Sequence, residues 1–200
     1  DSNFILELVF KREQWAAAVQ IRQLAEEGAV EMVCPFPVGA EPFSYLSYRT
    51  MERSQFIESL RGKSRELDRS VEQGHGVQKI QDVVQYMENL TASEGEALSD
   101  EFGRLLRHAR LLQVDAAVFL TARHFADTYQ LTMKDALVLA SICADLTRTA
   151  PNPPTPRSYF LSRDVRAFEK TISELRALNC VYQRSFEHAL RAIAADLINP

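Results

Sequence analysis

The sequence of 200 residues is poor in glycine and cysteine, with seven glycines and three cysteines. Cys34, Cys143 and Cys180 are odd in number and far apart, which excludes a dense disulfide framework and the close spacing of zinc or redox motifs. We expect reduced, mostly buried thiols in a cytoplasmic protein. No apolar run reaches the ~20 residues that span a bilayer, and no signal segment opens the chain, so we expect a soluble protein.

An excess of basic residues is also lacking. Lys and Arg number 23 against 27 Asp and Glu, so the formal net charge is −4. This balance argues against a protein that holds nucleic acid by bulk positive charge. The 46% hydrophobic and 25% charged fractions are those of ordinary globular chains and exclude collagen-like or disordered proteins. The length predicts a single domain over residues 1–200.

Hydrophobic periodicity divides the chain into helices and short strands. It predicts helices over 4–10, 15–27, 114–129, 132–146, 165–178 and 186–197, with a further helix carrying Glu41. It predicts strands over 30–34, 158–162 and 179–182. The charged region 49–112 is interpreted as a mainly helical insertion with a turn at 74–76, and the proline-rich segment 151–156 as a stiff loop. Strands separated by helices predict a parallel sheet joined by crossovers.

Four carboxylates fall at the places where an open parallel sheet binds ligands, beyond the carboxyl ends of its strands. Asp164 follows the 158–162 strand, and Glu41 lies early in the helix after the 30–34 strand. Asp135 is in the first turn of a helix, and Asp1 opens the first helix. Carboxylates brought together need a compensating cation, and hard oxygen ligands without thiols favour Mg²⁺ or Mn²⁺.

Each of these residues also has a purely structural interpretation. Thr132 and Asp135 fit a capping box, and Asp164 fits the N-cap of its own helix. Glu41 taken alone is typical of a solvated helix surface, and Asp1 taken alone has no evident role. The basic runs around 49–65 and 104–110 are either solvated helix faces or the walls of a phosphate-binding groove.

The residues around these carboxylates resemble the motifs of PIN-domain nucleases. Residues 1–3, Asp-Ser-Asn, resemble the opening motif of the family, and Glu41 matches its second acidic position. Residues 134–140, KDALVLA, are similar to its third motif, and residues 161–168, LSRDVRAF, to its fourth. The order and spacing of all four motifs agree with the family.

The resemblance implies an α/β, PIN-like three-layer fold with a central parallel sheet flanked by helices, plus the helical insertion 49–112. It implies that Asp1, Glu41, Asp135 and Asp164 form the catalytic, metal-binding quartet of a Mg²⁺- or Mn²⁺-dependent endoribonuclease. By the same resemblance, Asn3 and Ser162 support the first and fourth carboxylates. Arg163 and Arg166, beside Asp164, are the candidates for binding substrate phosphates.

The resemblance leaves alternatives open. The chain is either a metal-dependent nuclease that hydrolyses RNA phosphodiester bonds or a catalytically inactive PIN-like scaffold that binds protein or RNA. Cleavage of structured DNA is a third option. The expected partners are an RNA substrate and, in the manner of the toxin nucleases of bacterial toxin–antitoxin pairs, an inhibitory antitoxin-like protein. A homodimer stays open, and no membrane partner is expected.

Two further expectations concern the quartet. A partly protonated α-amino group at Asp1 would compete with the metal, so we expect an apolar strand to precede Asp1 in the native chain. Setting the four proposed ligands aside changes the formal net charge from −4 to zero. The acidic excess is therefore compatible with an enzyme that cuts nucleic acid, although it argues against one that wraps it.

Overall fold

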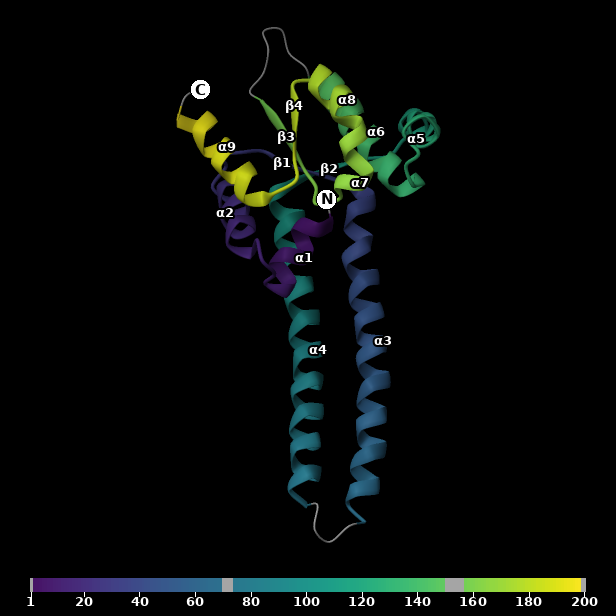
Figure 1. Cartoon of the computed structure of the whole chain (residues 1–200). Coiled ribbons are helices and arrows are strands. Elements are labelled where there is room, and N and C mark those ends of the chain that lie inside the picture. Colours follow the sequence, from purple (N-terminus) through teal and green to yellow (C-terminus); the bar gives the residue numbers. More distant parts are fainter. Residues whose placement is uncertain (1, 70–73, 150–156, 199–200) are drawn as a thin grey trace. The chain divides into compact units, whose positions relative to one another are not determined.

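The computed structural model describes residues 2–69, 74–149 and 157–198 (Figure 1). Its helices are α1 (Ser2–Phe10), α2 (Trp15–Glu26), α3 (Phe36–Leu67), α4 (Gly74–His108), α5 (Ala116–Tyr129), α6 (Met133–Thr149), α7 (Val165–Phe168), α8 (Ile172–Ala177) and α9 (Phe186–Ile198), with a 3₁₀ turn η1 (Glu169–Thr171). Its strands are β1 (Met32–Pro35), β2 (Ala109–Leu112), β3 (Ser158–Leu161) and β4 (Cys180–Gln183).

The chain forms two compact units. One takes in residues 1–41 and 101–200, and the other takes in residues 42–100. The second unit therefore consists of the greater part of α3 and α4, and it covers most of the region that the sequence indicated as a helical insertion. The four strands and all the predicted site residues belong to the first unit.

The predicted central parallel sheet flanked by helices, in a three-layer PIN-like fold, is wrong. Helices make up 78% of the described residues, so the fold is mostly helical. The strands form two separate parallel pairs, β1 with β2 and β3 with β4. Each ladder has only four residues per strand. The rule that strands separated by helices pair in parallel holds within each pair, but within the described residues no ladder joins the two pairs into one sheet.

Strand β2 was missed because the region 49–112 had been interpreted as a mainly helical insertion without strands. Residues Ala109–Leu112 follow a long amphipathic helix without a break, and only two of the four are large apolar residues. Their strand conformation comes from pairing with β1, where Met32 lies opposite Ala109 and Cys34 opposite Leu111. The turn predicted at 74–76 is also wrong, because α4 begins at Gly74. The predicted loop 151–156 lies outside the described residues.

Three buried clusters make the core of the first unit, and the smallest joins α5 to α6. In one, α1, α2 and α9 pack together, and the ring of Phe4 meets that of Phe186 edge-on at 5.5 Å between centroids. In another, β1, β3 and β4 pack against α6 and α8, and Phe160 meets Phe168 at 4.8 Å. Because β3 contributes to both of the larger clusters, the residue that follows it is held from two sides.

Helix ends in this unit follow the local signals. Gly28, with φ of 73°, comes directly after the last turn of α2, where a left-handed conformation favours glycine. Asp115 is the N-cap of α5, and its Oδ1 accepts a hydrogen bond from the Val118 amide at 2.8 Å.

In the second unit, α3 and α4 run side by side in opposite directions (Figure 1). The more buried positions recur every three and four residues, which is the spacing of a coiled-coil seam. On α3 they are Leu46, Thr50, Arg53, Ile57, Leu60, Ser64 and Leu67. On α4 they are Val77, Ile80, Val84, Met87, Thr91, Glu94 and Leu98.

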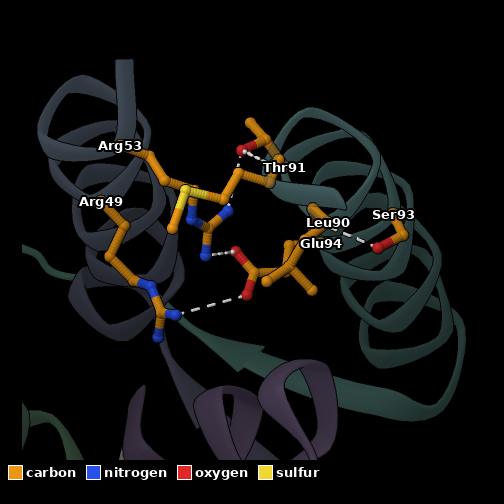
Figure 2. Close-up of polar contacts among 7 residues, drawn as sticks. Arg49, Arg53, Leu90, Thr91, Ser93 and Glu94 are labelled. Atoms are coloured by element: carbon orange, nitrogen blue, oxygen red, sulfur yellow. Dashed lines mark hydrogen bonds and ion pairs between the residues drawn. The ribbon is translucent and has the colours of Figure 1, made fainter. Parts of the chain in front are cut away.

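A polar contact interrupts this apolar seam, as Figure 2 shows. Arg53 donates to Glu94 at 2.8 Å and to the Thr91 hydroxyl at 2.8 Å. Arg49 approaches the second oxygen of Glu94 at 3.4 Å. Glu94 and Arg53 are only 9% and 11% exposed, so this ion pair is largely shielded from water.

Candidate functional site

Side chains from separate parts of the first unit line one small cavity of about 40 Å³. Glu41 on α3, Asp135 on α6 and Asp164 after β3 are three of the four predicted carboxylates, and all three line it. The other lining residues are Ser2, Asn3, Val38, Lys134, Val138 and Phe168. At roughly 10–15 Å³ for each water, the cavity has room for an ion and a water. The fourth predicted carboxylate, Asp1, lies outside the described residues.

Glu41 is held between a cation and a hydroxyl. Its Oε1 accepts a hydrogen bond from Lys134 Nζ at 2.7 Å, and its Oε2 accepts one from the Ser2 hydroxyl. Partial burial opposes ionisation, but the two hydrogen bonds and the charge of Lys134 outweigh it, so the pKa of Glu41 lies below its ordinary value. Glu41 is therefore a carboxylate at neutral pH.

Asp135 has the capping contacts that the sequence indicated as its structural alternative. The Thr132 hydroxyl accepts a hydrogen bond from the Asp135 amide at 3.2 Å and donates one to Asp135 Oδ2 at 2.6 Å. The capping contact and the place in the cavity coexist, because only one carboxylate oxygen is used by Thr132. The side chain is oriented by the cap, and this places it in the first turn of α6 at the cavity wall.

Asp164 is the N-cap of α7, where its Oδ1 accepts a hydrogen bond from the Ala167 amide at 3.0 Å. Its own amide donates to the fully buried Ser162 hydroxyl at 3.1 Å. Ser162 thus makes the contact that a support of the fourth carboxylate requires, and it does not line the cavity itself. Asn3, the other predicted support, does line it.

Two residues of the site escaped the sequence analysis. Lys134 was noted only as part of a motif, although its ammonium contacts Glu41. Its position directly before the candidate ligand Asp135 was the signal that could have identified it. The hydroxyl of Tyr182, from β4, donates to the Ser162 carbonyl at 3.0 Å and braces the loop that carries Asp164. Burial and then the charge of Asp164 raise the pKa of Tyr182 to about 12, so this hydroxyl keeps its proton.

An open groove adjoins the cavity and shares Asn3 and Asp164 with it. Its other lining residues are Arg12, Arg163, Val165 and Arg166. Three guanidinium groups thus lie beside the carboxylate-lined cavity. This is the position in which cations would hold the phosphates on either side of a bond placed at the cavity.

Arg163, one of the two predicted substrate-binding residues, has a structural partner instead. Its guanidinium donates to Glu7, which is fully buried within α1, and approaches the exposed Glu13 at 3.3 Å. The second oxygen of Glu7 accepts a hydrogen bond from the Gln14 amide at 2.9 Å. Glu7 is a single charged residue in a mostly apolar helix, and nothing in its sequence neighbourhood indicates that Arg163 is its partner.

Arg166, the other predicted substrate-binding residue, is exposed at the rim of the groove. Arg12 lies between α1 and α2, and its guanidinium stacks over the Phe10 ring at 5.3 Å from the ring centroid. Arg12 and Arg166 thus line the groove together with Arg163, whose partner is the buried Glu7.

The donor chemistry of the cavity fits a hard divalent cation, because its polar lining consists of carboxylate, amide and hydroxyl oxygens with one ammonium. The spacing is wider than in a closed metal site: within the described ranges, no three His, Cys, Asp or Glu side chains lie close enough to share an ion. Glu41, Asp135 and Asp164 are each held by a separate hydrogen bond. A cation bound here would have to take an oxygen of Glu41 from Lys134.

Other charged and thiol groups of the first unit lie outside the cavity. Asp145, on the same helix as Asp135, forms a two-pronged ion pair with Arg110 at 2.7 and 2.9 Å. Of the three cysteines, which are all free thiols, Cys34 and Cys180 are buried. In the part of the chain that the structure describes, no helix combines the length and the apolar character that crossing a membrane requires.

Comparison with known proteins returned no match: no protein-family model, no curated protein and no solved structure is similar to this chain.

Proposed function

We propose that this chain is a Mg²⁺- or Mn²⁺-dependent endoribonuclease related to the PIN-domain nucleases. One observation carries the proposal: Glu41, Asp135 and Asp164, which come from distant parts of the sequence, line a single cavity. Three acidic residues rarely gather around an ion-sized space without a cation to balance them, since like charges raise one another's pKa.

In the proposed enzyme, Glu41, Asp135 and Asp164 would hold the divalent ion, with Asn3 beside them, after moving closer together than they lie in the structure. An ion held by these residues supplies an activated water and stabilises negative charge on the phosphoryl group. Arg166 and Arg12 bind the RNA phosphates in the adjoining groove and so place one phosphodiester over the cavity. Ser162 and Tyr182 hold the backbone that orients Asp164.

The test compares conservative substitutions inside and outside the cavity. Asp135→Asn and Asp164→Asn each remove a charge. Asp164→Asn keeps the N-cap of α7, since Asn caps as well as Asp, and Asp135→Asn keeps a side-chain oxygen that can accept the hydrogen bond from the Thr132 hydroxyl. Asp127→Asn makes the same chemical change on the exposed surface of α5. We expect Mn²⁺-dependent cleavage of a labelled RNA oligonucleotide to fall to the level seen with chelator in the first two variants. Asp127→Asn should cleave like the wild type.

Cleavage that persists in both cavity variants would refute the assignment. A DNA oligonucleotide of the same sequence, tested in parallel, separates a ribonuclease from a nuclease for structured DNA. Circular dichroism on each variant verifies that the fold is retained.

A second candidate is a catalytically inactive scaffold that binds RNA or a protein partner such as an antitoxin-like inhibitor. The contact between Lys134 and Glu41 favours it, because an ammonium can balance the carboxylates without any metal. Titration with Mn²⁺ separates the two functions: saturable binding that Asp164→Asn weakens supports the enzyme, whereas no binding near neutral pH together with retained RNA binding supports the scaffold.

A further inference from the structure

The hairpin formed by α3 and α4 in residues 42–100 has two unlike flanks. On one flank lie the residues that directly follow seam positions, and there Arg61 pairs with Glu88 at 2.7 Å. On the other flank lie the residues that directly precede seam positions, because an antiparallel pair of helices brings like positions together. Among these residues are the apolar Phe56 on α3 and Val83 and Leu90 on α4.

This second flank, which we call the apolar flank, leaves large side chains in water. Phe56 is 50% exposed and Val83 is 44% exposed. Tyr86, one helical turn from Val83 on the same side of α4, is 66% exposed. Two helices can bury only the seam between them, so a contiguous apolar strip of this kind indicates a partner surface.

The charge of the hairpin excludes a polyanionic partner. Residues 42–100 contain 7 Lys and Arg against 10 Asp and Glu, a formal charge of 7 − 10 = −3. The charges beside the apolar flank are, by contrast, complementary to themselves. The ion pairs Arg53–Glu94 and Arg61–Glu88 show which residues of the two helices lie opposite each other. A residue of α3 and a residue of α4 lie at the same height along the hairpin when their numbers add up to about 148.

A second copy of the hairpin, related by a two-fold axis along its length, would lay α3 of one copy on α4 of the other at the same level. Phe56 would then meet Leu90 of the other copy. Near the far end of the hairpin, Glu66 would meet Lys79, and at the opposite end Arg49 would meet Asp100. Each contact occurs twice, as an isologous interface requires.

The available area suits such an interface. Residues 42–67 of α3 span about 39 Å at 1.5 Å per residue, and two adjacent helices are about 20 Å wide, so each copy would contribute roughly 800 Å². A total of roughly 1,600 Å² is the size of a standard specific interface.

We propose that the apolar flank of the hairpin binds a second copy of this chain, so that four helices pack as a bundle with α3 of each copy against α4 of the other. The proposal is independent of the nuclease activity, because it concerns residues 42–100 alone.

The first test measures the mass of the full chain by light scattering over a range of concentrations. We expect the wild type to have twice the chain mass of 22.7 kDa. Phe56→Glu should be monomeric at the same concentrations, because a charge at the centre of the interface cannot be buried unpaired. Met51→Glu, at a 51% exposed position on the outer side of α3, should remain dimeric. Circular dichroism verifies that both variants keep their helices.

The second test exchanges charges. Glu66→Lys and Lys79→Glu should each weaken the dimer, because each variant places like charges opposite each other twice. Mixing the two variants restores opposite charges in the heterodimer alone, so heterodimer should exceed the half of all dimers expected at random. Three results would overturn the proposal: a monomeric wild type, a dimer that Phe56→Glu leaves intact, or random mixing of the charge variants. In each case the apolar flank would instead be a binding surface for a different protein.

Discussion

Arg163 shows at the scale of one residue how a charge expected to bind substrate can instead stabilise the fold. It neutralises Glu7, which is fully buried in α1. Replacing Arg163 by methionine would leave that carboxylate without its cation in an apolar core. Removing one partner of a buried ion pair costs about 3–5 kcal/mol; because the Arg163 side chain is 33% exposed, we expect a loss of about 2–3 kcal/mol in the free energy of unfolding.

Urea denaturation of Arg163→Met measures this loss, with Arg166→Met as the matched control. Arg166 lines the same groove and, among the described residues, pairs with no buried carboxylate, so its replacement should change stability by less than about 0.5 kcal/mol. Equal stability of the two variants would mean that Glu7 is buried without needing Arg163.

Lys134 is the second residue whose role can be isolated. Its contact with Glu41 joins side chains that are 50% and 36% exposed, and such pairs contribute less than about 1 kcal/mol. If Lys134 competes with a divalent ion for Glu41, Lys134→Met should bind Mn²⁺ more tightly by up to about fivefold. Calorimetric titration of both proteins measures the difference, and unchanged or weaker binding would mean that Lys134 does not compete.

The same variant has a pH signature. Because the folded-state pKa of Glu41 is lowered, its ionised form stabilises the fold above the unfolded-state pKa of ~4.3, and this contribution is lost as the pH falls through the folded-state value. The stability difference between the wild type and Lys134→Met should thus be largest at neutral pH and shrink below pH ~4. A difference that grows in acid would contradict this origin.

Among the elements, local signals located helices better than strands. Gly28 and the periodicity of 15–27 marked α2 correctly, because a helix is set by contacts within three or four residues. Strand β2 was not recognisable, since Ala109–Leu112 becomes a strand only by pairing with β1, far away in the sequence. For the same reason the joining of all strands into one sheet was wrong: composition shows that strands exist, but not which edges meet.

The candidate site divides in the same way. The carboxylates could be selected from the sequence because each sits at a recognisable place, such as the first turn of α6 for Asp135. The partners of these carboxylates could not be selected in this way. Lys134 and Glu41 are 93 positions apart in the sequence, and Arg163 and Glu7 are 156 positions apart. Pairing of charges across the fold is thus the information that a single sequence lacks.

The hairpin of α3 and α4 carries a prediction at the scale of an element. Arg53 and Glu94 are nearly buried in its seam (Figure 2), so removing one of them leaves the charge of the other buried without a counter-charge. We expect Arg53→Met alone to lower the free energy of unfolding by about 3 kcal/mol. The double variant Arg53→Met with Glu94→Leu should recover most or all of it, because apolar replacements of buried pairs are neutral or stabilising.

Thermal denaturation of the single and double variants measures the coupling between the two residues. If the ion pair also sets the register of the hairpin, the double variant will be stable but will lose the pairing of Arg61 with Glu88. If the double variant is less stable than both single variants, the ion pair itself stabilises the hairpin, beyond the mutual neutralisation of its two charges.

For the whole molecule, charge distribution decides how nucleic acid would bind. The formal net charge of −4 argues against a broad basic surface, and the groove beside the cavity is lined by Arg12 and Arg166 as well as by Arg163, which pairs with Glu7. Each phosphate neutralised on a single strand lowers the logarithm of the binding constant by about 0.7 per decade of salt. Two contacts therefore predict a slope of about −1.4 for single-stranded RNA.

Fluorescence anisotropy of a labelled RNA, measured in chelator between 50 and 300 mM KCl so that no cleavage occurs, gives this slope. Arg166→Ala should halve it to about −0.7, whereas Arg148→Ala, at an exposed position near the end of α6, should leave it unchanged. A slope steeper than about −4 would place binding on several further cations outside the groove. A slope near zero would mean that no phosphate is held at all, and RNA would then be excluded as the substrate of the neighbouring carboxylates.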